Sequence, residues 1–159
     1  MLETIQFKGF KSIKSNLVID ISSKKDFNAI FGRLNSGKSI IYEAIEMFIH
    51  IFKNGFKGLN NSYEDETTSF VVNFDFLNKK YVYELSFNLF RMEISYEVLS
   101  QLKKNEKQVL FSREGSFIKT TQAFKKSFSS FDFERVETYM YDLSFDKRVS
   151  ILNSLSNKD

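Results

Sequence analysis

The sequence contains no cysteine, no proline and only one histidine, His50, among its 159 residues. The absence of cysteine excludes disulfides, thiolate metal sites and a cysteine nucleophile, and it suits a reducing compartment. A lone histidine excludes a metal site built from several histidines. Because proline is missing, no position stands out as a sharp boundary between domains.

Long apolar runs are missing as well. No stretch approaches the ~18 consecutive apolar residues that a membrane-spanning helix requires, and the start of the chain lacks the basic and apolar segments of an export signal. We therefore expect a cytoplasmic protein with no membrane partner. The formal net charge of +3 is small, and lysines are interspersed with acidic residues, so composition does not by itself indicate nucleic-acid binding.

What the chain does contain is typical of a folded domain. Hydrophobic residues make up 42% of the sequence and charged residues 27%, and there are nineteen phenylalanines and seven tyrosines. This aromatic content argues against disorder, and the length fits a single domain with one core.

The first third of the chain predicts strands followed by a helix. Three short strands are expected within residues 2–31: Ile5 and Phe7 share a face in the first, Val18 lies opposite to Ile19 in the second, and the third covers 27–31. From Lys38 the apolar period changes to that of a helix packed against a core on more than one side, ending at Asn54, Gly55 and Gly58. The apolar residues with this spacing are Ile40, Ile41, Ala44, Ile45, Phe48, Ile49 and Phe52.

The remainder predicts an antiparallel meander and then helices. Alternating residues form three apolar faces, of which the third is Met92, Ile94, Tyr96 and Val98. Turns are expected at 78–80 and 113–115. From Thr121 onward we expect helices, with Phe124 and Phe128 one turn apart and a weaker apolar face over 149–155.

One segment carries a chemical signal: FGRLNSGKSI, residues 31–40, matches G-x-x-x-x-G-K-[ST] from Gly32 to Ser39. The match has physical meaning because a strand is predicted before it and a helix after it. Main-chain amides can then surround a phosphate while the helix N-terminus adds partial positive charge.

Each position of the motif has a role in this interpretation. The two glycines let the backbone turn where a side chain would collide with the ligand. Lys38 reaches the β- and γ-phosphates, and the Ser39 hydroxyl is the predicted Mg²⁺ ligand. The residues expected to contact the nucleotide are Gly32, Asn35, Ser36, Gly37, Lys38 and Ser39. Glu43 and Glu46, one turn apart on the following helix, are interpreted as its solvated edge.

The surroundings of the motif narrow the class of protein. A Ras-like GTPase needs an N-K-x-D motif, and the terminal SNKD lacks the spacer residue. Small-molecule kinases alternate strands and helices after the loop, whereas a long meander is predicted here.

The segments FKGFKSIKS, NLVIDIS, NAIFGRLNSGKSIIYEAIEMF, YVYELSFN, EISYEVL and VLFSREGSFI resemble the ABC-type ATPases of the SMC, RecF and OLD-like group, including abortive-infection ATPases. The resemblance implies an α/β fold, the N-terminal lobe of a P-loop NTPase. It would have a mixed sheet around the loop helix in 1–58, an antiparallel meander in 69–120 and a helical segment in 121–159. It also implies ATP as the nucleotide, and that Lys11 and Ser12, in the turn after the first strand, approach it.

Two motifs of this family are absent: the glycine-containing signature, and an apolar run ending in Asp-Glu that supplies the carboxylates for hydrolysis. The resemblance therefore implies an ATP-binding lobe that hydrolyses ATP only with a C-terminal lobe or partner subunit, commonly as a homodimer. DNA is a possible partner, in DNA repair or phage defence. Two alternatives remain: a nucleic-acid-binding or protein-interaction module with a non-catalytic loop, and a small kinase-like transferase.

Overall fold

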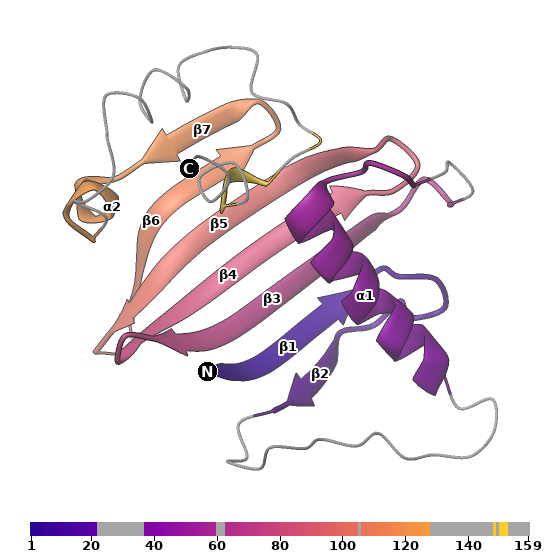
Figure 1. Cartoon of the computed structure of the whole chain (residues 1–159), viewed down its shortest axis with the longest axis horizontal. Coiled ribbons are helices and arrows are strands. Elements are labelled where there is room, and N and C mark those ends of the chain that lie inside the picture. The colour runs from indigo at the N-terminus through magenta and orange to yellow at the C-terminus, as the bar shows by residue number, and fades with distance from the viewer. Residues whose placement is uncertain (22–36, 60–62, 105, 128–147, 149, 153–159) are drawn as a thin grey trace.

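The computed structural model describes residues 1–21, 37–59, 63–104, 106–127, 148 and 150–152. In this part of the chain, seven strands form one sheet, in the order β2-β1-β3-β4-β5-β6-β7, and two helices accompany it (Figure 1). The elements are β1 (Leu2–Lys8), β2 (Leu17–Asp20), α1 (Lys38–Asn54), β3 (Thr67–Phe76), β4 (Lys79–Asn88), β5 (Glu93–Lys103), β6 (Glu106–Glu114), β7 (Phe117–Thr120) and α2 (Gln122–Ser127).

The expected α/β fold with a mixed sheet around the loop helix is wrong for the described residues. Every neighbouring pair of strands is antiparallel, and strands from the predicted 1–58 and 69–120 units belong to the same sheet. The reason is local: successive strands from β3 to β7 are joined by short turns, which permit only antiparallel pairing, whereas parallel strands need long crossovers. The strand predicted at 27–31 lies outside the described residues.

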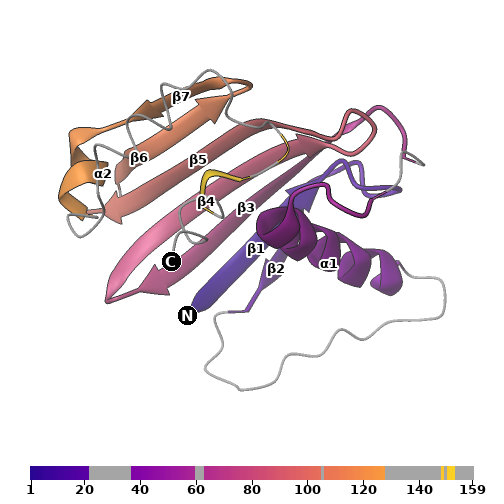
Figure 2. The same ribbon diagram turned by 45° about the horizontal axis from the view of Figure 1, so that its top comes forward.

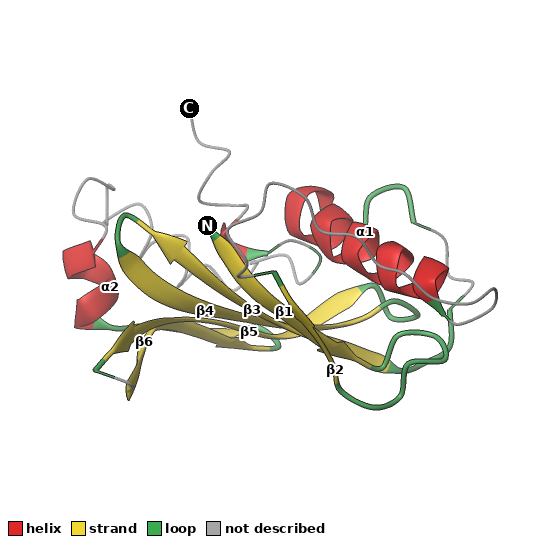
Figure 3. Ribbon diagram, turned by 90° about the horizontal axis from the view of Figure 1, so that it is seen from below, coloured by secondary structure: helices red, strands yellow, loops and turns green. Residues whose placement is uncertain are grey.

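Helix α1 covers one face of the sheet, and no described helix lies on the opposite face (Figures 2 and 3). Its Phe48 ring packs against Phe70 of β3, with centroids 4.9 Å apart, and Phe52 meets the edge of Tyr83 of β4 at 5.8 Å. Ala44 and Ile51 of the same helix are fully buried. Most of the apolar stripe read from the sequence therefore packs on a core, but Ile49, which was predicted to belong to it, is 44% exposed. Helix α1 ends before Gly55 as predicted.

The core lies between α1 and the strand residues that point toward it. Ile5 and Phe7 of β1 are both buried, as the alternation predicted, and the Phe7 ring stacks on Phe70 at 5.2 Å. Val18 of β2 is exposed, whereas Ile19 packs against the core. Period-2 alternation places these side chains on one face, where burial of aromatic area provides most of the stabilisation.

Two turn predictions need correction. The β3–β4 turn consists of Leu77 and Asn78, both with positive φ (48° and 60°), so it lies one residue earlier than expected. Two left-handed residues match the twist of a two-residue hairpin, although leucine rarely adopts this conformation. The β6–β7 turn begins at Gly115, and Arg113, expected in the turn, is instead buried in β6 at 1% exposure.

A bulge in β5 changes which of its side chains face the core. The β4–β5 register shifts between Ser86 and Phe87, so that Phe87 opposes Ile94 while Ser86 opposes Tyr96. The predicted common face of Ile94, Tyr96 and Val98 is therefore wrong, because the extra residue reverses the alternation after Ile94. As a result Glu97 points into the core.

Helices were expected after Thr121, and α2 confirms the first of them. Its Phe124 is buried and meets the edge of the Phe111 ring at 5.9 Å. Phe128 and most of the predicted face over 149–155 lie outside the described residues, apart from 150–152. Neither described helix combines the length and apolar character required to cross a bilayer.

Candidate functional site

The described part of the predicted phosphate motif is its last three residues, at the N-terminus of α1. Gly37 is the N-cap, with φ 84° and ψ 5°, a left-handed conformation that glycine adopts without strain. Among the described residues, an added Cβ there would meet no atom within 4 Å, so they leave the space beside Gly37 open. Lys38 and Ser39 follow as the first two helical residues, and Ser39 is exposed. Gly32, Asn35 and Ser36 lie outside the described residues.

The helix end is electrostatically suited to an anion. The first amides of an α-helix have no partner within the helix, and the aligned peptide dipoles place about half a positive charge there. No acidic residue occupies the first turn of α1, whose length of 17 residues keeps its dipole aligned over several turns. An anion at this position can therefore accept hydrogen bonds from main-chain amides.

The turn that follows β1 forms the second part of the site. The Gly9 amide donates to the Ile13 carbonyl at 2.8 Å, and the Ile13 amide donates back to the Phe10 carbonyl at 2.9 Å. The Phe10 side chain is buried, at 1% exposure, and the Thr68 hydroxyl donates to the Gly9 carbonyl at 2.8 Å. Hydrogen bonds and burial thus fix this turn against β3.

An ion pair connects this turn with α1. The Lys11 ammonium donates to the Glu43 carboxylate, and the two side chains are 44% and 45% exposed. Glu43 lies four residues after Ser39, so the two side chains are neighbours on one side of the helix, one turn apart. The structure therefore pairs the predicted Lys11 with Glu43, which lies one helical turn from the predicted Ser39. Sequence analysis had interpreted Glu43 only as a solvated residue.

Ser12, the other residue predicted in this turn, lines a cavity of about 650 Å³. Lys14 and Glu66 form an ion pair at the cavity wall, and this hydrogen bond raises the pKa of Lys14. The cavity also contacts Lys11, so the turn has one cation toward α1 and another toward residues 64–66. Its lining is Gly9, Phe10, Lys11, Ser12, Lys14, Tyr63, Glu64, Glu66, Thr68 and Leu89.

Metal ligands are sparse in the part of the chain that the structure describes. No group of three or more histidine, aspartate or glutamate side chains gathers there to hold a metal ion. Ser39 provides a single exposed hydroxyl.

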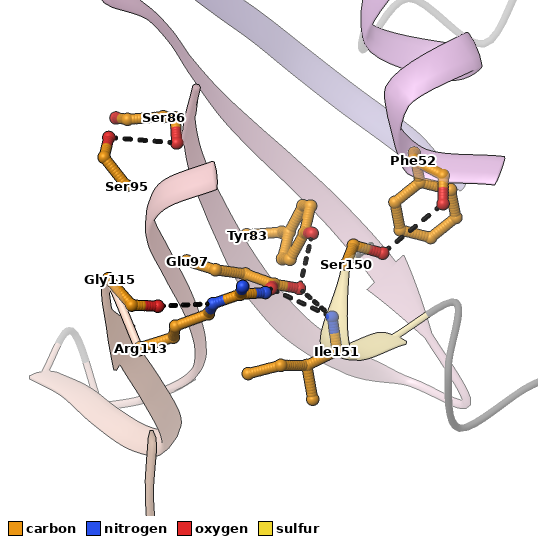
Figure 4. A network of polar contacts seen from close by, with 9 residues as sticks. All are labelled: Phe52, Tyr83, Ser86, Ser95, Glu97, Arg113, Gly115, Ser150 and Ile151. Carbon is orange, nitrogen blue, oxygen red and sulfur yellow. Dashed lines mark hydrogen bonds and ion pairs between the residues drawn. The ribbon is translucent and has the colours of Figure 1, made fainter. Parts of the chain in front are cut away.

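A buried polar network, which the sequence did not reveal, lies on the α1 side of the sheet (Figure 4). The Glu97 carboxylate accepts hydrogen bonds from the Tyr83 hydroxyl at 2.8 Å and the Ile151 amide at 2.9 Å. Arg113 lies 3.7 Å from the same carboxylate, and its Nε donates to the Gly115 carbonyl at 2.9 Å. The Ser150 hydroxyl donates to the Phe52 carbonyl at 3.3 Å, which links residues 150–151 to the end of α1.

Burial dominates the titration of this network. Loss of solvation raises the pKa of Glu97, opposed by the hydrogen bonds from Ile151 and Tyr83 and by the charge of Arg113. Burial, together with the Glu97 charge, raises the pKa of Tyr83 well above its ordinary value. Tyr83 therefore stays protonated and serves as a donor. The cavity lined by Ser12 does not include Glu97 in its wall, and both charged groups of the network are buried, so we assign the network to structure rather than to a binding site.

Comparison with models of known protein families and with curated proteins finds no match to this chain.

Proposed function

We propose that this chain binds ATP, together with Mg²⁺, at the N-terminus of α1. The observation that carries the proposal is the left-handed Gly37, with open space beside it, directly before Lys38 and Ser39. In this arrangement main-chain amides can donate hydrogen bonds to a phosphate group, and the helix dipole attracts its negative charge. The choice of ATP comes from the resemblance to the ABC-type ATPases.

Each described residue of the motif has a task in this proposal. Lys38 neutralises charge on the β- and γ-phosphates, and the exposed Ser39 hydroxyl holds one coordination position of Mg²⁺. The metal, when bound, neutralises charge on the same phosphate oxygens. Lys11 approaches from the β1–β2 turn as a second cation, through its position beside Glu43.

Hydrolysis requires groups that the described residues do not bring to this helix end. Phosphoryl transfer depends on a carboxylate near the metal and on a group that orients water, so we propose that a partner lobe or a second copy supplies them. We place this assembly in the cytoplasm.

Lys38→Ala is expected to weaken binding of a fluorescent ATP analogue by roughly 10- to 100-fold, the loss for one charge-assisted contact. Fluorescence titration in Mg²⁺ buffer measures the change. Lys57→Ala is the matched control, because it removes the same charge from an exposed position beyond the end of α1 and is expected to leave affinity unchanged. Equal affinity of wild type and Lys38→Ala would contradict the proposal.

Ser39→Ala is expected to abolish most of the gain in affinity that Mg²⁺ provides, while binding without metal stays close to wild type. The reason is that the hydroxyl contacts the metal rather than the phosphates. Parallel titrations with Mg²⁺ and with EDTA separate the two components. A variant that keeps the full Mg²⁺ dependence would show that Ser39 is not a ligand.

A further inference from the structure

The backbone fixes the place of Lys11 before any ligand arrives. Lys11 has φ 51°, a left-handed conformation that lysine seldom adopts, between the buried Phe10 and the bridge to Ile13. Its ammonium lies 5.7 Å from the centre of the Phe10 ring, within the range of a cation–π contact. The observed pairing with Glu43 places the ammonium against α1.

The partner of the Lys11 ammonium is the Glu43 carboxylate on α1. Glu43 lies four positions after Ser39 in α1, which corresponds to about 6 Å along the helix axis. Residues four apart lie on one side of a helix, so Glu43 and Ser39 share the side of α1 that Lys11 meets. The Lys11 ammonium, paired with that carboxylate, thus lies within about one helical turn of the position assigned to the phosphates and Mg²⁺.

The Lys11–Glu43 ion pair is also weak enough for an anionic ligand to replace Glu43 as the partner of Lys11. Both side chains are close to half exposed, and ion pairs in contact with solvent contribute little to stability. A triphosphate carries several negative charges and so attracts the ammonium more strongly than one carboxylate does. The same Glu43 charge repels an anion at the helix end.

We propose that Glu43 is an internal counter-ion of the phosphate site: it holds Lys11 beside the site in the empty protein, and the phosphates displace it on binding. This inference rests on the proposed function. In this proposal Glu43 is a positioning residue that acts through Lys11. Only a ligand with several negative charges attracts the ammonium strongly enough to break its pair with Glu43.

The test is a double-mutant cycle with the fluorescent ATP analogue and with inorganic triphosphate as probes. Glu43→Gln is expected to tighten binding by about two- to fivefold, the range for an exposed ion pair. In a Lys11→Ala background the same change is expected to tighten binding less, because there is no ammonium to release and only the direct repulsion between Glu43 and the anion is removed. Glu46→Gln is the matched control, an exposed glutamate on the same helix, three residues further from its start.

The outcomes separate the two proposals. If Lys38→Ala does not weaken binding, the proposed function itself fails. If binding depends on Lys38 but Glu43→Gln leaves affinity unchanged, or tightens it equally with and without Lys11, only the counter-ion role fails. As a second readout, the ¹⁵N signal of the Lys11 ammonium should shift when triphosphate is added to wild type and should already be shifted in Glu43→Gln. A signal that is identical in wild type and variant overturns the role.

Discussion

Glu97→Ala is expected to lower the free energy of unfolding by about 3–5 kcal/mol, because it leaves a buried guanidinium without its counter-ion. Arg113 is 1% exposed and Glu97 is fully buried, so water cannot replace the lost partner. The Tyr83 hydroxyl and the Ile151 amide lose their acceptor at the same time. Urea denaturation followed by circular dichroism measures the change.

Glu84→Ala is the control for this experiment. Glu84 lies on β4 and pairs with the exposed Lys107 at 2.8 Å, so removing its carboxylate breaks an ion pair in contact with solvent. Such pairs contribute about 0–1 kcal/mol, and a small effect is expected. Similar losses for Glu84→Ala and Glu97→Ala would contradict the assignment of the network as a buried structural element.

The pH dependence of stability gives a second check on Glu97. Burial raises its folded-state pKa above the ordinary value of 4.5, so its favourable contribution is complete below that pH and declines as pH rises through the folded-state pKa. Glu97→Gln removes this component. The stability of wild type minus that of Glu97→Gln should therefore decrease as pH increases above about 4.5. A constant difference would show that the carboxyl titrates normally.

Hydrogen exchange at the Ile151 amide gives a local measure of its hydrogen bonds to the Glu97 carboxylate. In wild type this amide donates to both oxygens of the Glu97 carboxylate, at 2.9 Å. Loss of the acceptor in Glu97→Ala is expected to speed hydrogen exchange at Ile151 beyond the change in global stability. Protection that falls equally at Ile151 and in the central strands would indicate global unfolding alone.

Gly9→Ala is expected to destabilise the protein by about 2–4 kcal/mol, from left-handed strain together with a steric clash. Gly9 has φ 74°, and an added Cβ would lie 2.2 Å from the Thr67 carbonyl oxygen. This neighbour is backbone of β3 and cannot move without disturbing the β1–β3 pairing. Thermal or urea denaturation of the variant provides the measurement.

Gly115→Ala is a matched control for Gly9→Ala, because it separates backbone strain from the clash. Gly115 also has positive φ, 58°, but an added Cβ there meets no atom within 4 Å. The expected loss is only the strain, about 1 kcal/mol. If both glycine variants lose the same stability, the close approach of Gly9 to Thr67 has no energetic consequence. Because the Gly9 turn also carries Lys11, Gly9→Ala should in addition reduce the effect of Glu43→Gln on nucleotide affinity.

The candidate site was predictable from sequence only in part. The motif and the start of α1 at Lys38 follow from local pattern, since the glycine, the lysine-serine pair and the apolar period are adjacent in the chain. Lys11 and Ser12 came from a family resemblance. The contact between Lys11 and Glu43 spans 32 residues, and no local pattern reports which glutamate a distant lysine will meet.

The sheet shows the same division between local and distant information. The alternation of apolar residues located the strands. It did not show that β1 pairs with β3, because α1 lies between them in the chain and the pairing depends on which apolar faces pack best. The bulge near Ser95 reversed the facing of later β5 residues and placed Glu97 inside, because one inserted residue shifts a period of two.

By itself, the sequence determined the short-range features of this protein: the Gly-Lys-Ser turn from which a phosphate site was predicted, the helix that follows it, and strands with one apolar face. Steric and hydrogen-bonding preferences over a few residues are sufficient for these. Only the tertiary structure decided that the described strands form one antiparallel sheet, that Glu97 and Arg113 share a buried network, and that Lys11 pairs with Glu43 on α1. Such contacts form when apolar faces that are distant in the sequence pack into one core. The free energy of this packing depends on the whole chain, so no single segment determines it.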